Sequence, residues 1–226
     1  MPRMGATRVD VLPDAAAAAQ VFADVIAREA RRTVADRGAF TIALSGGTAP
    51  WQAFRLLREA EVPWEQVEIF QVDERVAPPR DDARNLAHLE DSLPPAAFAR
   101  LRPMPVEADE LDSAAAEYAA LLPERLDVVH LGLGPDGHTA SLVPGDPVLD
   151  VRDRDVAMTV GEYQGCRRMT LTYPAIDRAR QLVWLVTGES KVEPLKLMLA
   201  RNPSIPAGRV SGPDSLVIAD SAASEG

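Results

Sequence analysis

An apolar run meets a glycine-rich turn in the sequence FTIALSGGTAP, residues 40–50. Residues 40–44 have the length and the apolar continuity of a strand that is buried on both faces. Pro50 suits the first position of a helix, because its fixed φ is helical and its missing N–H needs no partner there. The turn at residues 45–48 therefore joins a buried strand to a helix, which is typical of a parallel sheet covered by helices.

The same alternation continues on both sides of this segment. Further apolar runs predict strands at residues 67–72, 127–133, 156–160, 168–171, 182–187 and 216–219, the last of which closes the sheet. Helical patterns lie at residues 15–37, between a capping Asp14 and Gly38, and at residues 85–92, 112–122 and 189–201. We therefore predict an α/β fold, Rossmann-like, with a mostly parallel sheet flanked by helices. Ligands bind such sheets at the carboxyl ends of the strands.

Length and composition are those of an ordinary globular protein. The 226 residues are 46% hydrophobic, and we expect residues 1–226 to form a single domain with one sizeable core. The net charge of −10 argues against binding to nucleic acid or to an anionic membrane. Cys166 is the only cysteine, which excludes an internal disulfide. Residues 1–12 lack the apolar run of a signal peptide and no run reaches the ~20 residues of a membrane span, so we expect a cytoplasmic protein.

The turn at residues 45–48 is a candidate anion site. Gly46 and Gly47 let the backbone approach a ligand closely, and the N–H groups at the start of a helix attract negative charge. Ser45 and Thr48 add hydroxyl donors. The turn lacks the Gly-Lys-Ser/Thr ending of a Walker A loop. The alternative is a plain tight turn in which Thr48 caps the helix.

A second cluster, GLGPDGH at residues 132–138, also follows a predicted strand. It contains the string G-x-G-x-x-G, but Pro144 and Gly145 interrupt the long helix that a dinucleotide site requires. His138 lies two residues from Asp136, and this pair has the chemistry of a general base and its partner. The alternative is a solvated loop histidine beside a turn aspartate. One Asp-x-His pair offers too few ligands for a catalytic metal, so we expect none.

Charged residues follow further strands. The triplet Asp73-Glu74-Arg75 comes directly after one of them, and a solvated charge cluster is the alternative interpretation. Arg168 and Lys191 have the chemistry of a phosphate clamp, although Lys191 also fits an ordinary surface position. Because salt screens charges beyond about 8 Å, a locally basic site is compatible with an acidic chain. His130 lies within an apolar run and is expected to be a histidine of the core.

These segments together resemble the 6-phosphogluconolactonase family. The resemblance rests on SGGTAP at residues 45–50, VDERV at 72–76, LGLGPDGHTASLVPG at 131–145, RMTLT at 168–172 and TGESK at 187–191. It implies a fold of the glucosamine-6-phosphate deaminase, ribose-5-phosphate isomerase and CoA-transferase type. It also implies hydrolysis of 6-phospho-D-glucono-1,5-lactone to 6-phosphogluconate, the second step of the oxidative pentose phosphate pathway, with no cofactor.

The resemblance also assigns roles to individual residues. His138 is expected to activate water, and Asp136 to orient the histidine or the water. The expected substrate-binding residues are Ser45, Gly46, Gly47, Thr48, Asp73, Arg75, Asn85, Gly134, Arg168 and Lys191. Arg75 or backbone N–H groups are expected to stabilise the oxyanion. The departures from the family's usual residues are Ala49, Arg84 and Val143, none of which removes a charged site residue.

Two other functions remain open from the sequence. An aminosugar-phosphate deaminase/isomerase resembles this chain in the phosphate loop and the Asp-Gly-His segment, but that family usually carries a glutamate just after the histidine. Residues 141–145 contain no carboxylate. A phosphosugar-sensing module without catalysis would need a DNA-binding partner, and no basic segment precedes residue 40. We expect a monomer, with a dimer left open, and the proline-rich loop at residues 76–84 is a candidate lid.

Overall fold

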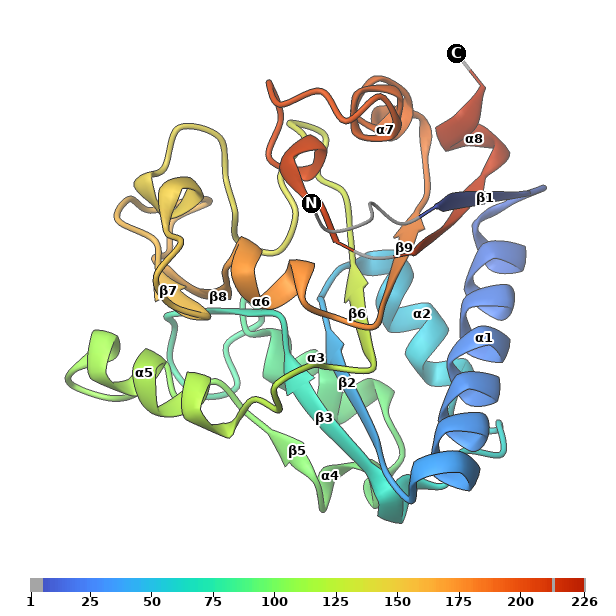
Figure 1. The fold of residues 1–226 in the computed structure, drawn as a ribbon, viewed down its shortest axis with the longest axis horizontal. Helices are drawn as coiled ribbons and strands as arrows, with labels where there is room; N and C mark the ends of the chain where they lie inside the picture. Colours follow the sequence, from blue (N-terminus) through green and yellow to red (C-terminus); the bar gives the residue numbers. More distant parts are fainter. Residues whose placement is uncertain (1–5, 213, 226) are drawn as a thin grey trace.

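The computed structural model describes residues 6–212 and 214–225. Within these residues, seven strands form one parallel sheet in the order β1-β10-β9-β6-β2-β3-β5 (Figure 1). These strands are β1 (Thr7–Leu12), β2 (Phe40–Leu44), β3 (Val67–Gln71), β5 (Leu101–Arg102), β6 (Val128–Leu131), β9 (Gln181–Val186) and β10 (Ser215–Asp220). The predicted α/β fold with a mostly parallel sheet is confirmed.

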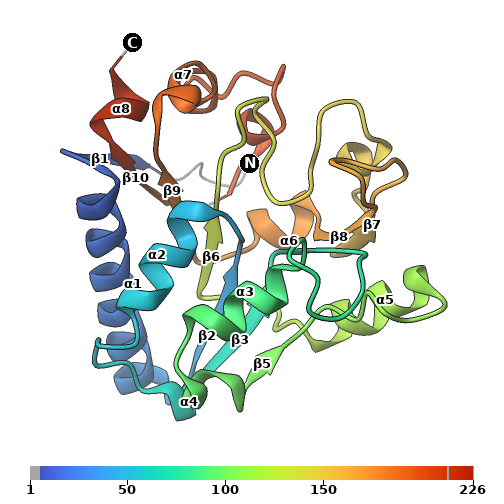
Figure 2. The ribbon, with the colours of Figure 1, turned by 180° about the vertical axis from the view of Figure 1, so that it is seen from behind.

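Helices cover both faces of this sheet. One face, seen from the front in Figure 2, carries α1 (Ala15–Arg37), α2 (Thr48–Leu56), α3 (Asn85–Ser92) and α4 (Pro95–Phe98). The other face carries α5 (Leu111–Leu121), α6 (Tyr173–Asp177), α7 (Val192–Leu199) and α8 (Ser221–Ser224). Successive strand residues point to opposite faces, so Ile42 and Ala43 belong to different clusters of buried apolar side chains.

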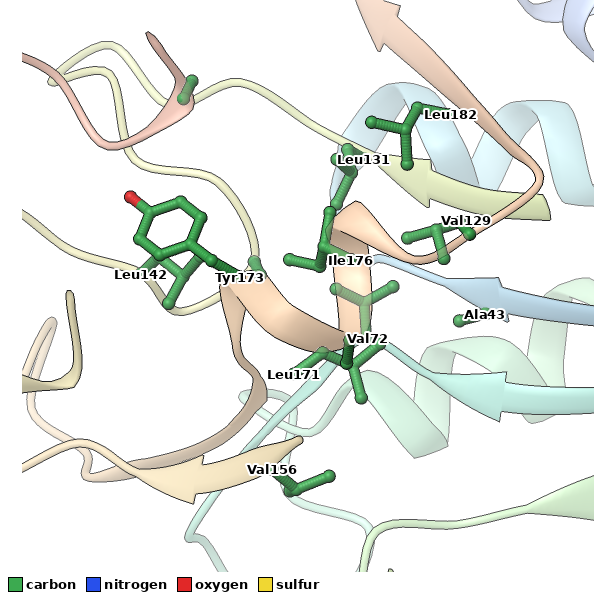
Figure 3. Packing of buried hydrophobic residues seen from close by; sticks show 14 of the residues in the cluster. Ala43, Val72, Val129, Leu131, Leu142, Val156, Leu171, Tyr173, Ile176 and Leu182 are labelled. Atoms are coloured by element: carbon green, nitrogen blue, oxygen red, sulfur yellow. The ribbon is translucent and has the colours of Figure 1, made fainter. Parts of the chain in front are cut away.

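A second, smaller sheet packs beside the first. Its antiparallel strands are β4 (Asp73–Arg75), β8 (Arg168–Leu171) and β7 (Val156–Met158), in the order β4-β8-β7. Val156 and Leu171 from this sheet share one buried cluster with Val72 and with Val129 of the main sheet (Figure 3). This apolar contact fixes the smaller sheet, and the charged residues at its edge, against the end of the larger one.

The ends of α1 follow from its flanking residues, as the sequence predicts. The side chain of Asp14 accepts the N–H of Ala17 at 2.8 Å and so caps the first turn. At the other end, Gly38 adopts a φ of 80°, and its N–H donates to the carbonyl of Val34.

The edge of the main sheet differs from the prediction. Residues 7–12 form β1 outside β10, so residues 216–219 do not close the sheet. An edge strand is partly solvated, and Val9 and Val11 are exposed. The segment therefore lacks the continuous apolar run that marks the inner strands.

Other differences concern shorter elements. Helix α2 begins at Thr48 rather than at Pro50. Residues 168–171 form a strand as predicted, but they pair within the smaller sheet, as do residues 156–158 of the strand predicted at 156–160. The helix predicted at residues 189–201 is a 3-10 turn, Glu189–Lys191, followed by α7. The other 3-10 turns are Trp64–Gln66, Pro147–Asp150 and Ala207–Arg209.

The chain changes direction in the main sheet between β2 and β6. From β2 it proceeds outward through β3 and β5, and it then returns to β6 and continues through β9 to β10. In sheets of this class the crevice outside the strand ends at such a point is the usual ligand site. The turn at residues 45–48 follows β2 and the loop at residues 132–138 follows β6, so the topology brings both predicted clusters to this crevice.

Some predictions fall partly outside the described residues. The predicted single domain includes residues 1–5, 213 and 226, and the absence of a signal peptide was predicted from a segment that includes residues 1–5. In the described part of the chain, no helix has the length and apolar character needed to cross a membrane.

Candidate active site

A cavity of about 490 Å³ opens at the carboxyl ends of the central strands. The predicted site residues on its wall are Ser45, Gly46, Gly47, Thr48, Asp73, Arg75, Asn85, Gly134, His138, Arg168 and Lys191. Asp136 is not on the wall, but it is hydrogen-bonded to His138, which lies on the wall. The structure therefore brings all the predicted site residues to one place.

The turn after β2 leaves its backbone donors available to the cavity. Gly47 is the N-cap residue of α2, has a φ of 138°, and makes no side-chain capping bond. Thr48 is the first residue of the helix, so the interpretation of Thr48 as the cap is wrong. The uncapped N–H groups and the positive end of the helix dipole together form a place for an anion.

Asn85, at the start of α3, connects this turn to the smaller sheet. Its Nδ2 donates to the backbone carbonyl of Asp73 at 2.9 Å. Its Oδ1 lies so close to Gly46 that a Cβ at residue 46 would overlap it. Gly46 is therefore a glycine because Asn85 packs against its Cα.

The acidic residues after β3 are buried rather than solvated. Glu74 is 0% exposed and accepts backbone N–H groups from the start of α3, including that of Asn85 at 2.7 Å. The guanidinium of Arg84 lies 3.4 Å from the same carboxylate. Asp73 is 3% exposed and accepts the hydroxyl of Ser141 at 2.7 Å. The solvated interpretation of this triplet is wrong, and Glu74 holds the start of α3 in place.

The cavity wall is locally basic although the chain is acidic. Among the described residues, the cationic side chains on the wall are those of Arg75, Arg168 and Lys191. Burial and the neighbouring charge of Arg75 lower the pKa of Arg168. Burial also lowers the pKa of Lys191, and the negative charge of Asp136 partly opposes this. Each of these cations is held where a bound anion would compensate the lost hydration.

Asp136 and His138 form a close pair on the loop after β6. His138 Nδ1 lies 2.6 Å from Asp136 Oδ1. An ionised carboxylate only accepts hydrogen bonds, so Nδ1 carries the proton and Nε2 is the basic nitrogen of the neutral ring. Burial acts to raise the pKa of Asp136, but the hydrogen bonds and charge of His138 outweigh it and lower that pKa. Gly134 is a glycine because a Cβ there would overlap the imidazole of His138.

His130 is a core histidine that also contacts the site. It is 0% exposed, and its Nδ1 accepts the backbone N–H of Ser45 at 3.2 Å. Its ring packs edge-on against Phe22 and Phe54. Burial lowers the pKa of His130 to about 3, so the ring is neutral and can accept this bond at ordinary pH. The sequence predicted its burial but gave no sign of its bond to the turn.

Sequence reasoning missed Tyr163, which contacts the Asp136–His138 pair, and Gln164 beside it. The hydroxyl of Tyr163 donates to Asp136 Oδ2 at 2.9 Å. The neighbouring Gln164 lines the cavity and accepts a hydrogen bond from Arg168 at 3.0 Å. Both lie in the segment GEYQGC, residues 161–166, which carries no motif and no apolar periodicity that would mark it.

This arrangement places cationic side chains and the start of α2 beside a histidine that is paired with a carboxylate. No group of at least three His, Cys, Asp or Glu side chains that could hold a metal is found in residues 6–212 and 214–225. The residues present are those needed to bind a phosphorylated molecule and to remove a proton from water or from the bound molecule.

Comparisons with known proteins agree with this description. The family model of glucosamine-6-phosphate isomerases/6-phosphogluconolactonase matches residues 13–218. A 6-phosphogluconolactonase from Synechocystis sp. is 40% identical over 175 residues, which cover 71% of this chain and 71% of that protein. A 6-phosphogluconolactonase from Nostoc sp. is 35% identical over 198 residues, 81% of each chain.

Solved structures share the fold. A 6-phosphogluconolactonase from Leishmania guyanensis superposes with a TM-score of 0.86 at 22% identity, over 98% of each chain. A monomeric glucosamine-6-phosphate deaminase superposes with a TM-score of 0.79 at 19% identity, over 96% of this chain and 98% of that one. The fold is thus common to both activities and does not distinguish them. The match over residues 13–218 and the identity to the bacterial relatives show that the chain belongs to the glucosamine-6-phosphate isomerase/6-phosphogluconolactonase family and that it is similar within it to the 6-phosphogluconolactonases.

Proposed function

We propose that this protein hydrolyses 6-phospho-D-glucono-1,5-lactone to 6-phospho-D-gluconate. The observation that carries the proposal is the joining, in one cavity, of a basic wall with the Asp136–His138 pair. The lactone is a phosphate ester with one activated acyl carbon, so it requires both features at once. The names of the bacterial relatives support the choice of substrate.

The phosphate occupies the basic part of the cavity. The N–H groups at the start of α2 bind its oxygens, and Arg168 and Lys191 complete the clamp. This binding fixes the lactone ring over the loop at residues 134–138. Arg168 contributes a planar fork that can bind two oxygens at once, whereas Lys191 acts as a point charge.

His138 then acts as the general base. Its Nε2 takes a proton from water while the oxygen of that water attacks the C1 carbonyl carbon. The tetrahedral oxyanion is stabilised by Arg75 or by backbone N–H groups, which are worth about 3–4 kcal/mol per well-placed donor. The ring oxygen leaves as C1–O cleaves, and it takes the proton back from His138. Base catalysis of this kind supplies roughly 10²–10⁴-fold.

The deaminase alternative is disfavoured by the segment after the histidine. Residues 141–145 offer no carboxylate to assist the opening of an aminosugar ring. Ser141 is fully buried, and its hydroxyl is already bound to Asp73. A sensing module without catalysis would not require the short Asp136–His138 bond.

The test is an assay with two substrates. In the first assay, 6-phosphogluconolactone is generated in situ, and its rate of loss with the protein is compared with its spontaneous rate of hydrolysis. In the second assay, glucosamine 6-phosphate is the substrate. The proposal requires acceleration of lactone loss and no release of ammonia from the aminosugar. Ammonia release would establish the deaminase, and binding of 6-phosphogluconate without acceleration in either assay would establish a binding protein.

A further inference from the structure

Tyr163 lies at the tip of a hairpin that reaches the cavity from the smaller sheet. The hairpin runs from Thr159 to Arg168, and the N–H of Thr159 donates to the carbonyl of Arg168 at 2.8 Å. Nearer its tip, the N–H of Tyr163 donates to the carbonyl of Cys166 at 2.9 Å. Gln164, with a φ of 54°, and the glycine after it turn the chain at the tip. The position of Tyr163 is therefore set by the backbone and not by its own side chain.

The hydroxyl of Tyr163 completes the hydrogen bonding of Asp136. Oδ1 of that carboxylate accepts from Nδ1 of His138 at 2.6 Å, and Oδ2 accepts from Tyr163 at 2.9 Å. The same hydroxyl is 3.3 Å from His138 Nδ1, and the two rings meet edge to face with centroids 5.2 Å apart. Oδ1 also accepts the backbone N–H of His138 at 3.2 Å, whereas Tyr163 is the donor to Oδ2. With both oxygens bound, the Asp136 carboxylate is held in one rotation, and that rotation sets the imidazole.

The other contact of the Tyr163 ring is with the basic wall of the cavity. The guanidinium carbon of Arg168 lies 4.9 Å from the ring centroid, in cation–π geometry. A single side chain thus lies between the predicted base and a predicted phosphate ligand. Burial and the negative charge of Asp136 raise the pKa of Tyr163, so its hydroxyl remains a donor across neutral pH.

We propose that Tyr163 is a positioning residue that holds Asp136, and through it His138, in the orientation that leaves Nε2 of His138 free for water. This inference rests on the proposed lactonase function for its kinetic consequences. Its structural consequence, the proton on Nδ1 of His138, does not depend on that function. The hydroxyl and the ring of Tyr163 make separate contacts, because the hydroxyl donates to Asp136 and the ring packs against the guanidinium of Arg168.

Kinetics distinguish these two contacts. Tyr163→Phe keeps the ring and loses the hydroxyl, so kcat should fall by about tenfold while KM stays within about twofold. Tyr163→Ala also removes the ring under Arg168, so KM should rise as well. Tyr118→Phe is the control. Tyr118 lies on α5, is not on the cavity wall, and its hydroxyl is buried against the backbone of residues 71 and 102 in β3 and β5. That variant should lose thermal stability and keep both kinetic constants.

A double-variant cycle tests whether the hydroxyl acts through Asp136. Combined with Asp136→Asn, the change Tyr163→Phe should cost no further activity, because its partner is already altered. A further tenfold loss in the double variant, or an unchanged kcat in Tyr163→Phe alone, would overturn the inference while leaving lactonase activity established.

Nitrogen NMR of the histidine rings supplies a readout without turnover. The chain has 3 histidines, so the His138 signals are assignable by substitution of the other 2. The neutral ring should carry its proton on Nδ1 in the wild type and should populate both tautomers in Tyr163→Phe. The same tautomer ratio in both proteins would overturn the inference even if the protein proved inactive toward the lactone.

Discussion

Arg75 and Arg168 are paired residues on the adjacent antiparallel strands β4 and β8, and both side chains line the cavity. Two guanidinium groups that face the same space repel each other, and burial together with Arg75 lowers the pKa of Arg168. A dianion between them would relieve this repulsion and gain charge-assisted hydrogen bonds. The pairing of these strands therefore concentrates positive charge at the cavity of a chain whose net charge is −10.

The first prediction concerns this positive charge. Arg168→Met should raise the KM for the lactone by about 10–100-fold, because hydrogen bonds from a charged group are worth about 1.5–3 kcal/mol. Arg167→Met is the matched control, since the neighbouring Arg167 is exposed and absent from the cavity wall. Steady-state kinetics of both variants provide the measurement. Equal effects of the two substitutions would argue against a phosphate ligand at Arg168.

The second prediction concerns the fit of the histidine against Gly134. Gly134→Ala places a Cβ in the volume of the His138 imidazole, so kcat should fall at least tenfold, while product affinity, set by the basic wall, changes little. In Gly161→Ala the new Cβ meets only Asp146, at an ordinary 3.5 Å. That control should keep wild-type activity. A fully active Gly134→Ala variant would show that the imidazole does not need its observed position.

The third prediction concerns stability against pH. The pKa of His130 is about 3 in the folded chain and near 6.5 in an unfolded one, so the unfolded state binds the proton more readily. The neutral ring's contribution is fully present above pH 6.5 and is lost as pH falls toward 3. From pH 7 to pH 5 this group alone should lower the free energy of unfolding by about 2 kcal/mol.

Urea denaturation at the two pH values checks this contribution. His130→Gln cannot titrate at this position. Its free energy of unfolding should therefore fall by about 2 kcal/mol less than that of the wild type between pH 7 and pH 5. His88→Gln, a change at a partly exposed histidine stacked on Trp51, serves as the control and should keep the wild-type difference. An identical pH dependence in His130→Gln would mean that the ring is not held neutral.

The fourth prediction concerns the loop at residues 76–84. Arg75, on the cavity wall, donates to the carbonyl of Ala83, and Arg84 donates to that of Ala77 at 3.0 Å. A ligand that fixes Arg75 should therefore slow amide hydrogen exchange in this loop. Exchange is measured with and without 6-phosphogluconate, with the distant helix α1 as the internal control. Unchanged exchange at residues 76–84 would argue against a lid.

The sequence predicts the inner sheet and the cavity residues for a physical reason. Strands buried on both faces are continuous apolar runs, and in a parallel sheet the polar residues after them meet at one edge. The predicted anion turn at residues 45–48 and the Asp136–His138 loop meet there for that reason alone. The strand at residues 7–12 escaped prediction because an edge strand is exposed on one side.

Contacts between distant segments could not be predicted in the same way. The bond of Tyr163 to Asp136 depends on how a hairpin of the smaller sheet packs against the larger one, and no local pattern encodes that packing. The burial of Glu74 could not be predicted for the same reason, because its carboxylate is covered by α3, which begins 11 residues later at Asn85. His130 was predicted to be buried, but its bond to Ser45 joins residues 85 positions apart.

The most direct test of the account is the activity of His138→Gln, which removes the base and keeps a side chain of similar size. If His138 Nε2 activates water, kcat for lactone hydrolysis should fall by roughly 10²–10⁴-fold. The affinity for 6-phosphogluconate, measured by calorimetry, should stay within about threefold because Arg168, Lys191 and the turn after β2 are intact. A kcat close to that of the wild type, with product still bound, would contradict the assignment of His138 as the base.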